Sequence, residues 1–401
     1  MTDSLPLAGM RVIELSSYIA SPLGGMTLAQ LGADVIRIDP IGGAADRNRW
    51  PLAPNGASLY WAGLNKGKRS LAVNLRSEEG RLLISDLVAS SGPDGGIMLT
   101  NAWPRPGLTY EDLRLKRPDV IHLLLNGRRD GTTAVDYLAN AVVGFPLVTG
   151  PAELAEPVNH VMPAWDVAAG LYIAVGLLAA ERRRSRTGLG QRIEIALEDV
   201  AVATAGNLGY LGEAELSTHP RQREGNQVYG DFGRTFATSD GVHVMILTLT
   251  PRHWQDLIRI MDFADAVPAL EKALSADLED GDQRYEHRDV INGFVTPWFA
   301  ARTFAEVEAA LTGSSLLWSR YNSFSELVSS DDYARNPMLA RIEQAETGGY
   351  LAPGAPLLLD GTQIAPEMAP TIGQHTDEVL AGLLDLEVEQ ICDLRERSIV
   401  A

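Results

Sequence analysis

The first forty residues alternate between two kinds of secondary structure. Residues 10–15 and 34–38 are short apolar runs that predict buried strands, and residues 22–31 between them predict a helix opened by a proline. A strand, a helix and a strand within about 30 residues form a βαβ unit, whose two strands lie parallel. This beginning predicts an α/β fold with a parallel sheet.

The alternation continues through the first half of the chain. The regular exchange of strands and helices predicts an open, Rossmann-like sheet with helices on both faces. Further strand-like runs stand at residues 71–75, 96–100, 120–125 and 192–197, and helical patterns at residues 78–89, 134–143 and 167–184.

The regular alternation of predicted strands and helices ends at about residue 210. Residues 234–238 and 242–249 predict a β-hairpin, because the Asp240-Gly241 pair between them favours a tight turn. Helical patterns follow, so we expect a second, smaller α+β domain. The predicted boundaries are 1–210 and 330–401 for a discontinuous large domain, 225–325 for the small domain, and 211–224 and 326–329 for linkers.

The composition disfavours several classes of partner and site. Asp and Glu outnumber Lys and Arg by 52 to 34, giving a net charge of −18, whereas nucleic acids and anionic membranes attract basic surfaces. The single cysteine, Cys392, excludes an internal disulfide, and the histidines do not cluster, so we expect no metal site. The longest apolar run, residues 167–180, is shorter than the roughly 20 residues of a membrane span. The N-terminus lacks a signal-peptide pattern, so the expected location is the cytoplasm.

The turn after the first strand lacks the signature of a dinucleotide-binding protein. Residues 16–25, SSYIASPLGG, stand where a nicotinamide dehydrogenase has the pattern G-x-G-x-x-G, so such an enzyme is disfavoured. Basic residues gather nearby instead, since the first 76 residues hold eight Lys and Arg against five acids. Arg37, Arg49 and residues 66–69 lie in or beside loops where an open sheet binds ligands, which predicts a site for a small polyanion. A solvated basic surface is the alternative.

Asp166 directly precedes the apolar run of residues 167–180. One interpretation is a helix N-cap. The other is a carboxylate nucleophile, and the two are compatible because a helix N-terminus favours an ionised carboxylate. Asp136, near the start of another predicted helix, shares this ambiguity. For His160, close by in the sequence, a structural histidine is the alternative to a functional one.

Four segments spread over nearly the whole chain carry a family resemblance. Together they resemble the family III CoA-transferases, which include formyl-CoA and carnitine CoA-transferases. The resemblance implies a Rossmann-like large domain, an interlocked homodimer and an acyl-CoA substrate, with coenzyme A as part of the substrate and no prosthetic group. The segments are LAGMRVIELSSYIASPLGGMTLAQLGADVIRIDP (7–40), NKGKRSLAVNLRSEEGR (65–81), RSRTGLGQRIEIALEDVA (184–201) and GQHTDEVL (373–380).

The resemblance also implies site residues. The family nucleophile is an Asp before an apolar helix and upstream of the Thr-Gly-x-Gly-Gln segment, which implies Asp166, with Asp136 as a supporting acid. Residues 102–107 depart from the family's Phe-x-Pro-Gly pattern, which leaves the adenine contacts open. A reduced form of the family's mobile glycine loop falls on Gly225, Asn226 and Gln227. The implied CoA contacts are Tyr18, Arg37, Lys68, Arg69, Val73 and Asn101.

Three further segments, DGTTAVDY, GFPLVTGP and PVNHVMPAWD, resemble one branch of the family. Its members move CoA from C1 to C4 within one mesaconyl (2-methylfumaryl) unit, which implies an isomerase acting through an aspartyl anhydride and an aspartyl-CoA thioester. Arg49, Asn159 and His160 are candidates to hold the free carboxylate. The alternatives are transfer from a donor such as succinyl-CoA to a separate acid, and a CoA-binding protein without catalysis.

Overall fold

The computed structural model describes residues 5–401 and divides the chain into two compact units. The first unit holds the residues up to 143, residues 160–216 and residues 334–401, and the second holds residues 144–159 and 217–333. Residues 144–159, which we expected in the large domain, thus belong to the second unit. The reason is a set of hydrogen bonds, because Arg223 donates to the carbonyls of Pro146, Leu147 and Thr149.

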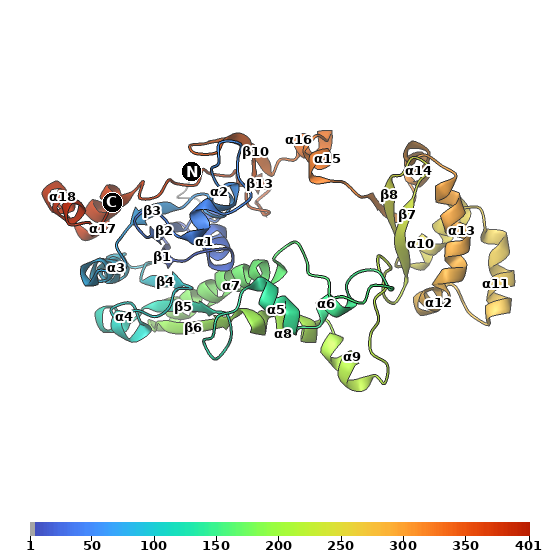
Figure 1. The fold of residues 1–401 in the computed structure, drawn as a ribbon, viewed down its shortest axis with the longest axis horizontal. Coiled ribbons are helices and arrows are strands. Elements are labelled where there is room, and N and C mark those ends of the chain that lie inside the picture. Colours follow the sequence, from blue (N-terminus) through green and yellow to red (C-terminus); the bar gives the residue numbers. More distant parts are fainter. Residues whose placement is uncertain (1–4) are drawn as a thin grey trace. The chain divides into compact units, whose positions relative to one another are not determined.

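The first unit is built on a six-stranded parallel sheet (Figure 1). Its strand order is β3-β2-β1-β4-β5-β6, and every neighbouring pair runs parallel. The predicted open α/β sheet is therefore confirmed. The strands are β1 (Arg11–Leu15), β2 (Asp34–Asp39), β3 (Arg69–Ala72), β4 (Ile97–Thr100), β5 (Ile121–Asn126) and β6 (Gln191–Ala196).

Helices cover both faces of this sheet. Helices α3, α4, α17 and α18 supply apolar residues to the core on one face, and α1 and α7 pack on each other and on the strands of the sheet. The helices of the first unit are α1 (Ala20–Gln30), α2 (Leu59–Leu64), α3 (Glu78–Ser90), α4 (Tyr110–Lys116), α5 (Asp136–Val142), α7 (Ala164–Thr187), α8 (Leu197–Asn207), α9 (Tyr210–Leu216), α17 (Thr376–Leu384) and α18 (Val388–Glu396).

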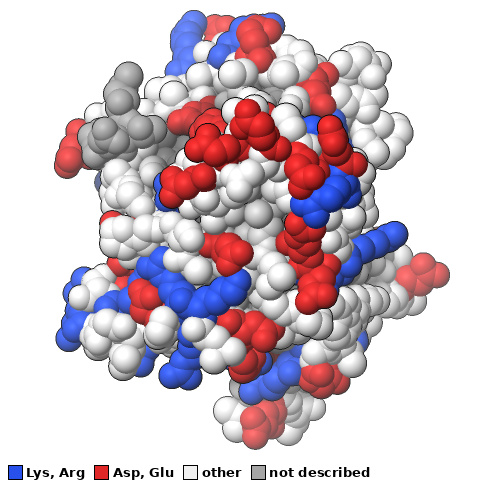
Figure 2. Space-filling model, turned by 90° about the vertical axis from the view of Figure 1, so that its left-hand side faces the viewer, with Lys and Arg blue, Asp and Glu red and all other residues white. Residues whose placement is uncertain are grey.

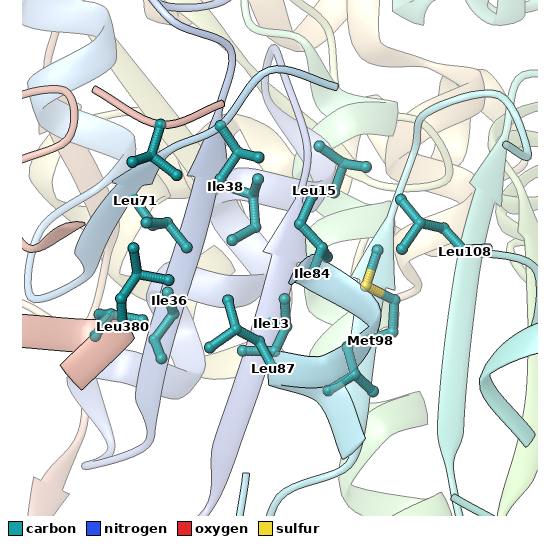
Figure 3. Packing of buried hydrophobic residues seen from close by; sticks show 14 of the residues in the cluster. Ile13, Leu15, Ile36, Ile38, Leu71, Ile84, Leu87, Met98, Leu108 and Leu380 are labelled. Atoms are coloured by element: carbon teal, nitrogen blue, oxygen red, sulfur yellow. The ribbon is translucent and has the colours of Figure 1, made fainter. Parts of the chain in front are cut away.

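The hydrophobic core lies between the sheet and α3 and α17 (Figure 3). Ile13 and Leu15 of β1 point into it together with Ile84 and Leu87 of α3 and Leu380 of α17. Alternate residues of a strand point to opposite faces, so the intervening Glu14 lies on the face covered by α1 and α7. The face of β1 that α1 and α7 cover therefore carries a buried charge, Glu14.

Two glycines let α1 and α7 approach closely. A Cβ added to Gly24 of α1 would lie 2.6 Å from the Ile173 side chain, and one added to Gly170 of α7 would lie 2.9 Å from the Ala20 carbonyl oxygen. Such distances are closer than van der Waals contact, so neither position accepts a larger residue without movement. Gly24 therefore lies at the contact between α1 and α7. This contact holds α7 beside the turn that joins β1 to α1.

Helix α7 is the one helix within residues 5–401 that is long and apolar enough to cross a membrane by length and composition. It packs against α1, β5, β6 and α8, which is the position of a core helix. Its other side leaves Leu171, Tyr172 and Val175 at least half exposed.

The C-terminal residues return to the edge of the sheet. Val400 pairs with Val73 next to β3, and the Ala401 amide donates to the Ala72 carbonyl. The glycine- and proline-rich stretch before α17 contains short antiparallel pairs that the sequence did not predict. These are β10 (Leu339–Gln344) with β11 (Gly348–Pro353), and β12 (Leu358–Leu359) with β13 (Thr362–Gln363).

The second unit combines a three-stranded antiparallel sheet with helices. The hairpin expected around Asp240-Gly241 is present, and β9 joins β8 as a third strand. Phe236 stacks on Phe299 in its core, with the ring centroids 5.0 Å apart. Its elements are α6 (Phe145–Val148), β7 (Phe232–Ala237), β8 (His243–Thr248), α10 (Pro251–Ile260), α11 (Val267–Leu274), α12 (Gly281–Glu286), α13 (Arg288–Ala300), α14 (Phe304–Leu311), β9 (Leu317–Arg320) and α15 (Phe324–Val328), with α16 (Asp331–Arg335) at the boundary between the units.

Acidic and basic side chains are interspersed on the face of the first unit that carries α3, α4, α17 and α18 (Figure 2). Several of them form exposed ion pairs. Arg397 bonds Glu79 of α3 at 2.7 Å, and Lys116 of α4 bonds Asp86 of α3 at 2.5 Å. Pairs this exposed contribute little to stability.

Candidate active site

A cavity of about 700 Å³ lies within the first unit at the carboxyl ends of β1, β4 and β5. The chain leaves β1 toward β2 and β3 on one side and returns to β4 on the other, so the strand order reverses between β1 and β4. Ligands of open α/β sheets bind at such a reversal. Tyr18, Arg49, Tyr60, Asn101, Asp136 and Asp166 line this cavity.

Asp166 lies in the first turn of α7, on the wall of the cavity. The helix begins at Ala164 with Pro163 as its N-cap, and no side chain caps it from that position. The interpretation of Asp166 as the N-cap is therefore wrong. Within residues 5–401 no side chain is hydrogen-bonded to the Asp166 carboxylate, so this group is available for chemistry.

Asp136 caps α7 in place of a local residue. Its Oδ2 accepts hydrogen bonds from the backbone amides of Trp165 at 2.8 Å and Asp166 at 3.2 Å. Its Oδ1 lies 2.5 Å from Nε2 of His160. Because Asp136 is buried and bonded on both oxygens, it fixes the backbone that carries Asp166.

The pKa of Asp166 is raised to about 7. Burial is the largest cause, since it disfavours the charged carboxylate, and the negative charge of Asp136 acts in the same direction. The positive charge of Arg49 opposes both. A carboxyl that titrates near neutral pH inside a cavity is typical of a functional group.

Arg49 lies over two aromatic rings of the cavity wall. Its guanidinium carbon is 5.7 Å from the ring centre of Tyr18 and 5.5 Å from that of Tyr60. No carboxylate within residues 5–401 forms an ion pair with it. The Tyr60 hydroxyl is buried without a hydrogen-bond partner in the described part of the chain, and burial raises its pKa, so it stays protonated as a donor. Tyr60 was not identified from the sequence, where a lone tyrosine carries no signal.

The turn after β1 is shaped by side chains from its neighbours. Asn101 accepts from the Ser17 amide at 3.1 Å and donates to the Ser17 carbonyl at 2.8 Å. The Asp46 carboxylate accepts from the Tyr18 amide at 3.0 Å. Tyr18 and Asn101 both line the cavity, as the CoA contacts implied by the resemblance would require, but the Asn101 amide is already bonded to this turn.

Most of the predicted cations are used inside the protein. Arg37 has no exposed surface, and the amine of Lys68 donates to Glu14, Asn65 and the Pro22 carbonyl. Arg69 begins β3 at the opposite end of the sheet, where it binds Asp34 and Glu378. The charged groups of these three residues are all bonded to carboxylates of the chain itself, so the structure does not support their predicted contacts with CoA.

Val73 also has no surface for a ligand. It is fully buried in the core and its backbone pairs with Val400. The predicted contact of Val73 with CoA therefore lacks support in the structure.

The remaining predicted residues divide between the units. His160 is in the first unit, but its Nε2 is taken by Asp136, which leaves it as a support for that carboxylate. Asn159 and residues 225–227 belong to the second unit. There the loop 225–227 borders a hollow of about 440 Å³ together with residues 150–153 and Arg234. Within residues 5–401 no three His, Cys, Asp or Glu side chains are grouped to hold a metal ion.

The chain matches the family model described as CoA-transferase family III over residues 7–376. It is 44% identical, over 98% of both chains, to the 2-methylfumaryl-CoA isomerase of Chloroflexus aurantiacus. It is 29% identical, over 100% of this chain and 99% of the relative, to the beta subunit of the succinyl-CoA–L-malate CoA-transferase of the same organism. A crystal structure of a CAIB/BAIF family protein from Brucella suis covers 94% of this chain and 99% of its own, with a TM-score of 0.78 and 23% identity, which is a likeness of fold.

Proposed function

Because the chain belongs to CoA-transferase family III, we propose that this enzyme moves CoA within one acyl unit and converts 2-methylfumaryl-CoA to 3-methylfumaryl-CoA. The observation that carries the proposal is Asp166, whose carboxylate has no hydrogen-bonded side-chain partner among residues 5–401 and lies in a cavity that it shares with the cation Arg49. The relative named for this reaction is 44% identical to the chain. The expected location is the cytoplasm, where acyl-CoA substrates are found.

The first half of the reaction moves CoA from C1 of the substrate to Asp166. A carboxylate oxygen of Asp166 attacks the thioester carbonyl at C1, the C–S bond breaks, and CoA leaves as a thiolate from a mixed anhydride. The thiolate then attacks Cγ of Asp166 and breaks the anhydride C–O bond. The products are an aspartyl-CoA thioester and the free mesaconate dianion. Each step exchanges one nucleophile for another, so no net proton or electron is required.

The second half runs the same steps at the other carboxyl group. The C4 carboxylate attacks Cγ of the aspartyl thioester, the C–S bond breaks, and the thiolate leaves from a second mixed anhydride. The thiolate then attacks the C4 carbonyl and breaks the anhydride C–O bond, which forms the new thioester at C4 and restores the Asp166 carboxylate. Between the halves the dianion must turn end for end without leaving. A retained carboxylate re-attacks at a high effective concentration, so retention makes the transfer intramolecular.

Arg49 is the proposed holder of the carboxylate that is not reacting. Its guanidinium has no ion-pair partner among residues 5–401 and shares the cavity with Asp166. A charge-assisted pair with a carboxylate is among the strong hydrogen-bonded contacts.

The intramolecular route is tested by isotope exclusion. Unlabelled mesaconyl-CoA is incubated with excess ¹³C-mesaconate, and the thioester is followed by mass spectrometry while isomerisation proceeds. We expect isomerisation with no label in the thioester. Label that enters at the rate of isomerisation would establish transfer to a separate acid, the alternative suggested by the succinyl-CoA–L-malate relative.

We also propose that the enzyme is an obligate homodimer. The exposed side of α7 carries Leu171, Tyr172 and Val175, which are 51%, 50% and 62% exposed. Contiguous apolar surface of this kind marks interaction sites, and a permanent dimer buries roughly 2,000 Å² or more.

Sedimentation at micromolar concentration measures this prediction. Val175→Glu is expected to weaken the dimer, whereas Leu115→Glu, which changes an exposed leucine of α4, is expected to leave it intact. A fully active monomeric wild-type enzyme would contradict the proposal.

A further inference from the structure

Arg37 stands at the centre of a buried set of ions behind the cavity wall. Its guanidinium donates to Asp39 at 2.9 Å, to Asn65 at 3.0 Å and to both oxygens of Asp46, the nearer at 3.1 Å. Arg37, Asp39 and Asp46 are each at most 1% exposed. Buried charges persist only when they are paired and hydrogen-bonded, and here each bond of the guanidinium is directed inward.

Asp46 joins this set of ions to the cavity wall in two ways. Its Oδ2 accepts the amide of Tyr18 at 3.0 Å, and its backbone carbonyl accepts the amide of Arg49 at 3.2 Å. Arg49 in turn lies over the ring of Tyr18, 5.7 Å from its centre. One residue therefore fixes the backbone of both members of this aromatic–cation pair.

Tyr18 needs such a restraint. Its φ is +66°, in the left-handed region that side-chain-bearing residues seldom adopt without support. Dinucleotide-binding proteins place glycines at the corresponding turn, and this chain has none between residues 16 and 23. The bond from the Tyr18 amide to Asp46, together with the bonds from Asn101 to Ser17, holds the turn in the shape that glycine would otherwise permit.

We propose that Asp46 is a positioning residue, which holds Tyr18 and Arg49 in place against the substrate. Buried Arg37 supports Asp46 in this role and does not bind CoA. The inference rests on the proposed function, because the reaction used to test it is the isomerisation of mesaconyl-CoA. In this proposal Arg37 has a structural role inside the protein, whereas the family resemblance implied that it contacts CoA.

We chose the variants from the balance of positive and negative side chains in this buried set. Arg37 and Lys68 are buried with Glu14, Asp39 and Asp46, which is two cations against three anions. Removing the charge of Asp46 leaves two of each, so Asp46→Ala should fold. Asp46→Asn retains one oxygen that can accept the Tyr18 amide and serves as the conservative variant. Arg37→Lys keeps the charge but loses the planar fork that reaches Asp39, Asn65 and Asp46 together.

Two thioesters separate positioning from CoA binding. The variants are assayed with mesaconyl-CoA and with the mesaconyl thioester of pantetheine, which lacks the nucleotide and its phosphates. We expect Asp46→Ala to lower kcat by about 10- to 100-fold, because small displacements of positioned groups cost about this much. Asp46→Asn should recover most of the loss, and Arg37→Lys should reduce the rate by the same factor with both thioesters. If the Arg37→Lys loss occurred only with mesaconyl-CoA, Arg37 would be a CoA ligand and the inference would be overturned.

Hydrogen exchange provides a readout that does not depend on activity. The Tyr18 amide should exchange faster in Asp46→Ala than in the wild type, since its acceptor is gone. Asp34→Asn is the matched control, because Asp34 also lies on β2 and binds two arginines, Arg11 and Arg69, at the other end of the strand. It should change neither Tyr18 exchange nor kcat. If Tyr18 exchange and kcat were both unchanged in Asp46→Ala, the inference would be refuted. If the wild type did not act on mesaconyl-CoA but Tyr18 exchanged faster in Asp46→Ala, only the proposed function would be refuted.

Discussion

Asp166→Asn is expected to abolish turnover and, at pH 8, to stabilise the folded protein. The amide cannot form the anhydride, and loss of a nucleophile costs about 10⁴- to 10⁶-fold in kcat. The stabilisation follows from the raised pKa of Asp166, about 7 in the folded protein against 3.8 for the ordinary group. The unfolded chain ionises first as pH rises, so the carboxyl destabilises the fold progressively between about pH 4 and 7 and fully above it. Three pKa units set an upper limit of about 4 kcal/mol.

Thermal unfolding at pH 5 and pH 8 measures the stability change. The gain in Tm of Asp166→Asn over the wild type should be larger at pH 8 than at pH 5. The control is Asp34→Asn, because arginine bonds from Arg69 and Arg11 lower the pKa of Asp34 against the effect of its burial. That variant should lose stability at pH 8. Near-normal turnover of Asp166→Asn, with an intact-mass spectrum that excludes deamidation to Asp, would remove Asp166 from the mechanism.

Changes at Asp136 should alter both the rate and the pH dependence of the enzyme. In the wild type, kcat/KM should fall about tenfold per pH unit below an apparent pKa near 7, because only the Asp166 carboxylate attacks. Asp136→Asn removes a negative charge that raises the pKa of Asp166, so the acid limb should move to lower pH. Asp136→Ala leaves the amides of Trp165 and Asp166 without their acceptor. It should cost about 1–3 kcal/mol of stability and about 10²- to 10³-fold in kcat.

The two variants separate charge from geometry. Asn keeps an oxygen for the helix amides while Ala does not, so only Ala should lose most of the rate at high pH. An acid limb that stays in place in Asp136→Asn would show that Asp136 does not influence the ionisation of Asp166. The measurement is kcat/KM between pH 5 and 9.

The parallel sheet and the position of Asp166 at the start of a long helix could be predicted from the sequence, and most contacts of the basic residues could not. Strand periodicity and the position of Asp166 before an apolar run are local features, and they led to the right helix and the right cavity. The partners of Arg37 and Lys68 come from residues far apart in the sequence, such as Glu14 and Asp46. A cation bound to such partners looks the same in the sequence as one that faces a phosphate.

The cap of α7 shows the same limit. Local sequence suggested Asp166 itself, since Asp before a helix is a common N-cap. The structure uses Asp136, which is 30 residues away from Asp166 along the chain. A cap supplied from another helix leaves no local pattern, although both acids had been identified as candidates.

Because the C-terminal residues return to β3, the first unit cannot complete its fold until the end of the chain has been synthesised. Val379, Leu380, Ile391 and Leu394 belong to the same core as α3, yet they leave the ribosome more than 280 residues after it. While the ribosome synthesises residues 217–333 of the second unit, the face of the sheet that α17 and α18 will cover therefore remains partly exposed. Long-range closure of this kind slows folding and prolongs the exposure of apolar surface. The last twenty-odd residues complete the domain that the first forty begin.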